Sequence, residues 1–395
     1  MSKVRNFIDQ PEMVKIITGM RRCGKSVMLE LIKQELLENG VSKDNILSYN
    51  FEDMGLRGLK DPVALHDHLK TQIDSKNGRT YLLLDELQEV EKWETCINSL
   101  RVNSDTDIYI TGSNAKMLAG EYATVMAGRY IEIRMYPFSF KEFYTAIGEK
   151  TQSLTEAFKL YQKQGGMPFL ANLTPSEADV KQYLKDIYTS VVIKDIMKHN
   201  NFRDVDLLER IILYVLANIG KTFSATSISK FFKSENRTVA PETILNYLKA
   251  CEEAYLLTIA KRFDLQGKKI LQVSEKYYVS DHGLREAVYG NNERDIELIL
   301  ENIVCMELLR RGFDVSVGFI GDKEIDFIGK RGGECIYVQV CYLLASPETI
   351  KREFGNFNTI SDNYPKYVVS MDEINLSRDG IQHKNIQEFL MAETW

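Results

Sequence analysis

A glycine-rich segment with one lysine and one serine is the first place where this sequence could do chemistry. It reads GMRRCGKS over residues 19–26. Glycines at its two ends allow backbone angles that turn amide N–H groups inward and form a nest for an anion. The lysine can then reach the β- and γ-phosphates of a nucleotide, while the serine hydroxyl binds Mg²⁺. The spacing GxxxxGK[ST] therefore predicts a phosphate-binding loop.

The segments on either side of this loop are those that such a site needs. MVKIIT (13–18) predicts a buried strand, and VMLELIKQELLENG (27–40) has apolar residues at helical spacing. Strand, loop and helix are the context of a Walker A motif, and the helix start adds its positive dipole end. ATP or ADP is expected to bind at the following residues: Gly19, Met20, Arg21, Arg22, Cys23, Gly24, Lys25, Ser26 and Val27.

Two acidic residues supply the second half of the predicted site. YLLL (81–84) predicts another buried strand, and Asp85 and Glu86 follow it directly. Asp85 would hold Mg²⁺ together with Ser26. Glu86 would polarise the attacking water, as a general base or by orienting it. The alternative is an acidic strand end at the surface.

Two polar residues and one arginine extend the candidate site. Ser113 and Asn114 follow a predicted strand, DIYIT (107–111), where either could sense the γ-phosphate. The alternative there is a simple polar turn. Arg129 precedes the predicted strand YIEIRM (130–135) and could stabilise the transferring phosphoryl group, in cis or from a neighbouring subunit. The alternative for Arg129 is a salt-bridged surface residue.

The overall composition limits the class of protein. The chain has 395 residues and a formal net charge of -6, which predicts two or three domains and excludes a chain-wide basic coat for nucleic acid. Its six cysteines form no CxxC pair, so neither a zinc ribbon nor a thioredoxin-like site is indicated. The sequence shows no run of about 18 apolar residues. We expect a soluble, cytoplasmic protein.

The motifs together identify a family resemblance over the full length of the chain. It resembles the prokaryotic AAA-type ATPases that carry a C-terminal domain of unknown function, DUF4143. The matching segments are ITGMRRCGKS (17–26), YNFED (49–53), LLLDELQEVEKWE (82–94), ITGSNAKML (110–118), GRYIEIRMYPFSFKEF (128–143), GGMP (165–168), IDF (325–327) and YPKYVVSMD (364–372).

This resemblance implies an α/β fold with four parts. The first, 1–136, would be a P-loop ATPase core with a parallel sheet. A helical lid would follow over 137–200, and a winged-helix-like domain over 201–280. The last part, 281–395, would be an α/β domain resembling a restriction endonuclease. The resemblance also suggests that GGMP (165–168) packs against the adenine, whereas the sequence itself shows only a turn that opens a helix.

The middle of the chain has helix-turn-helix organisation. SATSISKFF (224–232) and APETILNYLKACEEAYLL (240–257) predict two helices around a polar turn, with Thr243, Asn246, Tyr247 and Lys249 on or near the exposed face of the second. Residues 221–276 contain ten basic and six acidic residues, a net charge of +4. That charge permits contacts with the phosphates of double-stranded DNA. A winged helix used for protein contacts or for packing is the alternative.

The C-terminal part has the layout of a PD-(D/E)xK nuclease without all of its residues. Glu301 lies within a predicted helix and Asp326 on a predicted strand, where such nucleases place acids that hold a metal. On the next strand Gln339 can offer an oxygen, but Cys341 takes the place of the lysine. We therefore expect a catalytically inactive nuclease fold.

These observations lead to three hypotheses of function. In the first, Mg²⁺-dependent ATP hydrolysis moves C-terminal domains that bind DNA or protein. In the second, ATP orders an interface for a protein partner or a second copy of the chain, and turnover is slow and incidental. In the third, the chain is an ATP-regulated DNA nuclease. None of them involves a membrane.

Overall fold

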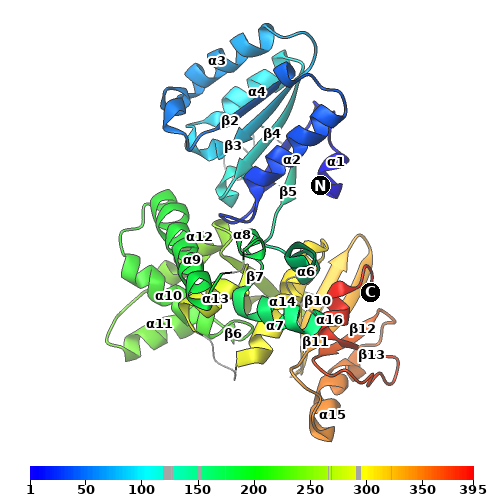
Figure 1. The fold of residues 1–395 in the computed structure, drawn as a ribbon. Helices are drawn as coiled ribbons and strands as arrows, with labels where there is room; N and C mark the ends of the chain where they lie inside the picture. The colour runs from blue at the N-terminus through cyan, green and yellow to red at the C-terminus, as the bar shows by residue number, and fades with distance from the viewer. Residues whose placement is uncertain are drawn as a thin grey trace. The chain divides into compact units, whose positions relative to one another are not determined.

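The chain folds into two compact units (Figure 1). The computed structural model describes residues 1–118, 126, 128–148, 153–173, 175–265, 267, 269–290, 295–321 and 323–395. The first unit contains Met1–Tyr136 and Glu253–Tyr255, and the second contains Pro137–Glu252 and Leu256–Trp395. In the described part of the chain, no helix is both long and apolar enough to cross a bilayer.

A five-stranded parallel sheet forms the centre of the first unit. Its strand order is β2-β3-β4-β1-β5. The strands are Val14–Thr18 (β1), Ile46–Asn50 (β2), Thr80–Asp85 (β3), Thr106–Gly112 (β4) and Tyr130–Arg134 (β5). The three central strands are buried along their whole length, as expected for parallel strands with helices on both faces. The predicted parallel α/β sheet is thus present.

Helices cover both faces of this sheet (Figure 1). They are Ser2–Arg5 (α1), Lys25–Glu38 (α2), Pro62–Asp74 (α3) and Trp93–Asn103 (α4). Alternate strand residues point to opposite faces, so Ile16 packs with α3 and α4 while Ile17 packs with α2. Two apolar cores therefore fix the sheet between its helices, and all five strands end at one edge.

The second unit begins with a helical region. Its helices are Phe140–Ile147 (α6), Leu154–Gln164 (α7), Pro168–Ala171 (α8), Glu177–Ser190 (α9), Val205–Ala217 (α10), Ala225–Ser234 (α11), Pro241–Glu253 (α12), His282–Val288 (α13), Ile296–Arg310 (α14), Pro347–Gly355 (α15) and Ile386–Met391 (α16). A π-helix, Val191–Lys198, continues α9. Ser139 and Glu142 form a capping box that starts α6, and Ser176 with Asp179 does the same for α9.

One eight-stranded sheet joins the rest of the second unit. Its order is β13-β12-β11-β10-β9-β7-β8-β6. The strands are Thr222–Phe223 (β6), Leu257–Asp264 (β7), Lys269–Val279 (β8), Asp314–Ile320 (β9), Lys323–Arg331 (β10), Glu334–Val340 (β11), Lys366–Ser370 (β12) and Gln382–Asn385 (β13). Strands β7 and β8 pair antiparallel and are called the wing below, and β7 pairs in parallel with β9. The segments 201–280 and 281–395 therefore share a sheet, and with 137–200 they form one unit.

Candidate nucleotide-binding site

The glycine-rich loop follows β1, the strand between β4 and β5 in the sheet. Three of its residues have positive φ angles: Gly19 (144°), Arg22 (68°) and Gly24 (105°). A Cβ atom on Gly19 would lie 2.4 Å from the carbonyl oxygen of Met135, which is far inside van der Waals contact. Only glycine fits at that position. The backbone thus has the turned conformation that a phosphate loop requires.

Lys25 is the buried cation of this loop. Its side chain is 4% exposed, and Nζ donates to the carbonyl oxygens of Gly19 (3.1 Å) and Met20 (3.2 Å). The loop thus wraps around the lysine that would reach the phosphates. The next residue, Ser26, is exposed in the first turn of α2, where its hydroxyl is accessible to a ligand.

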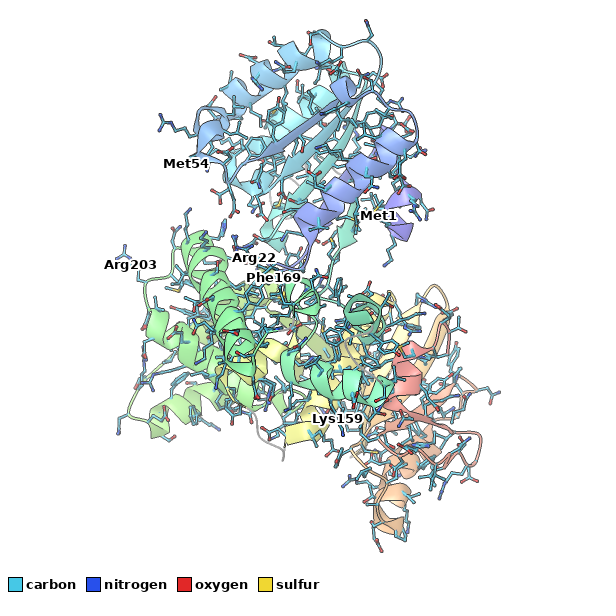
Figure 2. The ribbon with its side chains drawn as sticks, in the orientation of Figure 1. Met1, Arg22, Met54, Lys159, Phe169 and Arg203 are labelled. Atoms are coloured by element: carbon cyan, nitrogen blue, oxygen red, sulfur yellow. The ribbon has the colours of Figure 1, made fainter. Side chains whose placement is uncertain are left out.

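The other loop residues divide into buried and exposed ones. Met20 and Cys23 are buried, and burial raises the pKa of the Cys23 thiol, so this cysteine is a packing residue. Arg21 contacts Glu52 Oε1 through Nη1 at 3.0 Å. The Arg22 side chain is exposed (Figure 2), and Val27 is 62% exposed on α2.

Asp85 is held at the tip of β3 by two neighbouring strands. Thr111 on β4 donates its hydroxyl hydrogen to Asp85 Oδ1, and Asn50 on β2 donates from Nδ2 to Asp85 Oδ2 at 3.3 Å. These bonds fix the plane of a carboxylate that is 6% exposed. Carboxylate and hydroxyl oxygens are the ligands that Mg²⁺ prefers, so Asp85 and Ser26 fit the predicted ion.

Glu86 occupies a strained position beside Lys25. Its φ angle is 53°, in the left-handed region that side chains other than glycine rarely adopt. Its backbone N–H donates to Thr111 Oγ1 at 2.9 Å, and its Oε1 lies 3.7 Å from Lys25 Nζ. Gln88 donates from Nε2 to the other carboxylate oxygen, Oε2. These contacts keep Glu86 in its strained backbone conformation, and such strain is common at functional sites.

The sheet order brings the remaining polar residues to the same edge. Ser113 and Asn114 follow β4, which lies between β3 and β1, and both are buried. They therefore lie between Asp85 and the glycine-rich loop. Gln88 Nε2 is 3.4 Å from Ser113 Oγ, which connects the tips of β3 and β4.

Arg129 lies at the opposite edge of the sheet. Strand β5 runs parallel to β1, with Tyr130 beside Val14 and Arg134 beside Thr18. Arg129 is therefore next to the start of β1, and the length of the strand, about 13 Å at 3.3 Å per residue, separates it from the loop. This register excludes the in cis alternative for Arg129. Arg134, at the other end of β5, is the arginine on the loop side.

Three residues of this site had no role in the sequence-based prediction. Thr111 and Asn50 hold Asp85, and Gln88 holds Glu86. Thr111 and Asn50 stand at the ends of their strands, so the same rule that selected Ser113 could have selected them. Gln88 lies in the DELQ segment that carried the family resemblance, but its contact with Glu86 required coordinates.

The acids of the C-terminal sheet surround a lysine from the wing. Lys276 on β8 places Nζ 2.8 Å from Glu301 Oε1, 2.6 Å from Glu324 Oε1 and 3.4 Å from Asp326 Oδ1. Burial lowers its pKa, but the three carboxylates outweigh that effect and raise it, so Lys276 is charged. Burial also raises the pKa values of Glu301 and Asp326, although Lys276 opposes this.

This cluster corrects one sequence-based inference. Cys341 does leave the third strand without the nuclease lysine, but the positive charge among the acids is present and comes from Lys276, 65 positions earlier in the chain. Within the described residues, no group of three or more histidine, cysteine or acidic side chains could hold a metal ion. The ammonium group takes the space between the carboxylates.

The GGMP segment is built into the second unit. Gly166 donates its N–H to Asp281 Oδ2 at 2.7 Å and accepts from the N–H of Phe138 at 2.7 Å. A Cβ on Gly166 would lie 2.2 Å from the Phe138 carbonyl oxygen, and one on Gly165 would lie 2.0 Å from Asp281 Oδ1. Close backbone approach within this unit therefore accounts for both glycines.

The helix-turn-helix is present as α11 and α12, with a different surface from the one predicted. Tyr247 is buried and stacks on Phe202 with ring centroids 4.2 Å apart, because it lies on the face that packs against the body of the unit. Its predicted place on the exposed face is wrong. In the turn, Arg237 Nη2 binds Asp204 at 2.7 Å and its Nη1 binds Asp206. Two acids thus already neutralise this arginine.

Comparison with known proteins places this geometry in a family. Residues 11–144 match the family model described as an AAA domain. An uncharacterized protein of Haemophilus influenzae is 38% identical over 362 residues, which cover 91% of this chain and 89% of that protein. The chain belongs to this family of AAA-domain proteins. A second member, an uncharacterized protein of Methanocaldococcus jannaschii, is 30% identical over 85% of this chain and 76% of its own length.

The match also corrects the expected name of the following region. Residues 155–295 of this AAA-domain protein match a domain of unknown function, DUF8612. The expectation of DUF4143 was wrong. Among solved structures, a Walker-type ATPase of Pyrococcus abyssi has the same fold with a TM-score of 0.51 and 12% identity, over 73% of this chain and 93% of that chain.

Proposed function

We propose that this AAA-domain protein binds ATP with Mg²⁺ and hydrolyses it at the strand tips of the first unit. The observation that carries the proposal is the sheet order. It sets the glycine-rich loop after β1 and the Asp85–Glu86 pair after β3, with Ser113 and Asn114 after β4 between them. A phosphate cradle, two metal ligands and a base then face one space, as phosphoryl transfer to water requires.

Each residue has a separate task in this proposal. Lys25 leaves the loop carbonyls and binds the β- and γ-phosphates, while the loop amides bind the other phosphate oxygens. Ser26 and Asp85 hold Mg²⁺, which supplies positive charge to the phosphate oxygens when bound. Glu86 takes a proton from the attacking water or orients it. Ser113 and Asn114 sense the γ-phosphate.

The remaining role for Arg129 is to act on a neighbouring copy of the chain. It is exposed at the edge of the sheet away from the loop, where a second copy of the chain can approach it. We propose that Arg129 stabilises the phosphoryl group bound by a neighbouring copy. Arg129→Ala should therefore slow turnover only under conditions where copies of the chain associate.

We propose that the second unit binds the partner whose contact the nucleotide controls. The exposed charged side chains on α12 are two acids, Glu242 and Glu252, and one base, Lys249. Helices that contact DNA phosphates carry an excess of basic residues. This composition, with Arg237 already paired to acids, favours a protein partner over double-stranded DNA for this face. The switch hypothesis uses the same partner without requiring turnover.

Steady-state phosphate release tests the proposal, with wild type and Lys25→Ala measured with and without double-stranded DNA. We expect Mg²⁺-dependent turnover that Lys25→Ala abolishes and that DNA does not change. Stimulation by DNA would restore the winged helix as a DNA-binding element. Nucleotide binding without turnover in the wild type would reject the hydrolysis mechanism and leave the nucleotide-dependent switch.

A further inference from the structure

A chain of polar side chains crosses three strand tips of the first unit. It runs from Lys25 after β1 to Glu86 after β3, then to Gln88, and ends at Ser113 after β4. Lys25, Glu86 and Ser113 already have proposed roles. Gln88 is the member without one, although it contacts two of the others.

The backbone of Gln88 is fixed by its apolar neighbours. It lies in the short 3-10 turn Leu87–Glu89, where Leu87 is fully buried and Val90 and Trp93 follow in the same apolar core. Two backbone hydrogen bonds close the turn, from Glu89 N to Glu86 O (3.1 Å) and from Val90 N to Leu87 O (3.0 Å). The side chain of Gln88 therefore starts from a rigid position beside the strand tips.

The two ends of the Gln88 amide have different surroundings. The amino end, Nε2, donates to Glu86 Oε2 and lies 3.4 Å from Ser113 Oγ. The carbonyl end, Oε1, is buried, and among the residues that the structure describes no donor lies within hydrogen-bonding distance of it. A buried amide oxygen without a donor is uncommon and needs a physical reason. Its position follows from the amino end of the amide, because the hydrogen bond to Glu86 leaves the oxygen facing the tip of β4.

The strand tip leaves room for this amide. A Cβ on Gly112, the last residue of β4, would lie 3.0 Å from Gln88 Oε1 and 1.7 Å from Met117 Sδ. The glycine therefore permits Gln88 to lie against β4. The carboxylate of Glu86 is held from both sides, by Gln88 at Oε2 and by Lys25 at Oε1.

We infer that Gln88 is a positioning residue for hydrolysis: its amino group holds the Glu86 carboxylate in the orientation in which Glu86 accepts a proton from the attacking water. This inference rests on the proposed function. When phosphate draws Lys25 away, Gln88 is the contact that keeps Glu86 in place. The fixed carboxylate then sets the direction of the attacking water toward the γ-phosphate.

Gln88→Met tests this inference, because methionine has nearly the same shape and neither donates nor accepts strongly. Phosphate release and binding of a non-hydrolysable ATP analogue are measured for wild type and the variant. We expect kcat to fall by about tenfold to a hundredfold, while KM and the analogue Kd stay within about threefold. Gln88→Glu, which keeps the oxygen but places a second carboxylate beside Glu86, is expected to be slow as well.

Two further variants separate positioning from a general structural role. Gln34 lies on the exposed face of α2 and donates a hydrogen bond to Glu38 Oε1 at 2.9 Å. Gln34→Met therefore removes a similar side-chain hydrogen bond outside the site and should leave kcat unchanged. Because Gln88 acts through Glu86, the double variant Gln88→Met/Glu86→Gln should be no slower than Glu86→Gln alone.

Three results would overturn the role of Gln88 while the wild type still turns over. They are an unchanged kcat in Gln88→Met, a parallel loss of kcat and analogue binding, or a double variant much slower than Glu86→Gln. A wild type that binds ATP without releasing phosphate would instead reject the proposed function, and the Gln88 inference with it.

Discussion

Gly19 is required for two separate physical reasons. Its φ angle of 144° is unfavourable for any other residue, and its missing Cβ leaves space for the Met135 carbonyl oxygen. The motif in the sequence indicated the first reason. The second depends on the strand that passes beside the loop, which no local pattern contains.

Gly19→Ala is therefore expected to weaken ATP binding by about tenfold or more, because the loop must shift to relieve the clash. Gly40→Ala is the matched control, since Gly40 also has a positive φ angle, 87°, but has no atom within 4 Å of the added Cβ. Titration with a fluorescent ATP analogue measures both. Equal affinities for the two variants would contradict the steric argument.

Lys276 is the residue whose role the sequence concealed most completely. Its partners Glu301 and Asp326 were selected from the nuclease pattern, yet the lysine comes from the wing hairpin. Long-range pairing of β7 with β9 brings the two segments together. A single sequence gives no signal for such a contact, because nothing at residue 276 resembles the nuclease motif.

Lys276→Met should destabilise the second unit by about 3–5 kcal/mol, because it leaves buried carboxylates without their cation. Trp395 lies in this unit and Trp93 in the first, so Trp395 fluorescence in a Trp93→Phe background reports urea unfolding of the second unit alone. Exposed Arg210, paired with Asp206 on α10 of the same unit, provides the control Arg210→Met. Unchanged unfolding in Lys276→Met would refute the buried network.

The raised pKa of Glu301 should make the stability of the second unit depend on pH. Burial raises its pKa above the usual 4.5, so the folded chain holds this proton more tightly than the unfolded chain. Its contribution to stability is full at low pH and is lost as the pH rises through the raised pKa. The free energy of unfolding of the wild type, relative to Glu301→Gln, should therefore decrease from about pH 4 to 8. A relative increase over that range would contradict the sign.

At the scale of elements, the parallel sheet and its helices follow from the sequence, and the sharing of the second sheet does not. Buried apolar runs next to the motifs predicted the four strands β1, β3, β4 and β5. Strand order is a long-range property. So is register: the pairing of β5 with β1 puts Arg129 and the loop at opposite ends of the strands, and the pairing of β7 with β9 joins the wing to the C-terminal strands.

The substitution Gly166→Ala tests whether the GGMP segment depends on close backbone packing. Gly166→Ala should destabilise the second unit, because its Cβ would lie 2.2 Å from a backbone oxygen of Phe138. Gly355→Ala is the control, since Gly355 has no atom within 4 Å of an added Cβ. Trp395 fluorescence again gives the unfolding transition. Wild-type stability in Gly166→Ala would show that this segment does not depend on the close backbone approach.

At the scale of the whole molecule, the residues proposed to act on the nucleotide all lie in one of the two units. Every residue assigned to ATP, Mg²⁺ or water lies within 1–136, together with both cores that support the sheet. The helix-turn-helix, the shared sheet and the Lys276 cluster lie in the other unit. The family resemblance implied a first part that ends at residue 136, and the first compact unit contains Met1–Tyr136 together with Glu253–Tyr255.

The fragment 1–136 is accordingly expected to fold and to bind ATP with an affinity within about tenfold of the full chain. Trp93 fluorescence and titration with an ATP analogue measure the two properties, with Lys25→Ala in the same fragment as the control. A fragment that folds but binds no nucleotide would show that the site also needs the second unit.

The measurement that tests the central claim most directly is Mg²⁺-dependent phosphate release by the wild type and Glu86→Gln, with ATP binding measured in parallel. We expect turnover in the wild type and, in Glu86→Gln, retained ATP binding with a kcat lower by about a hundredfold or more. Equal turnover in the two proteins, or binding without turnover in both, would contradict it.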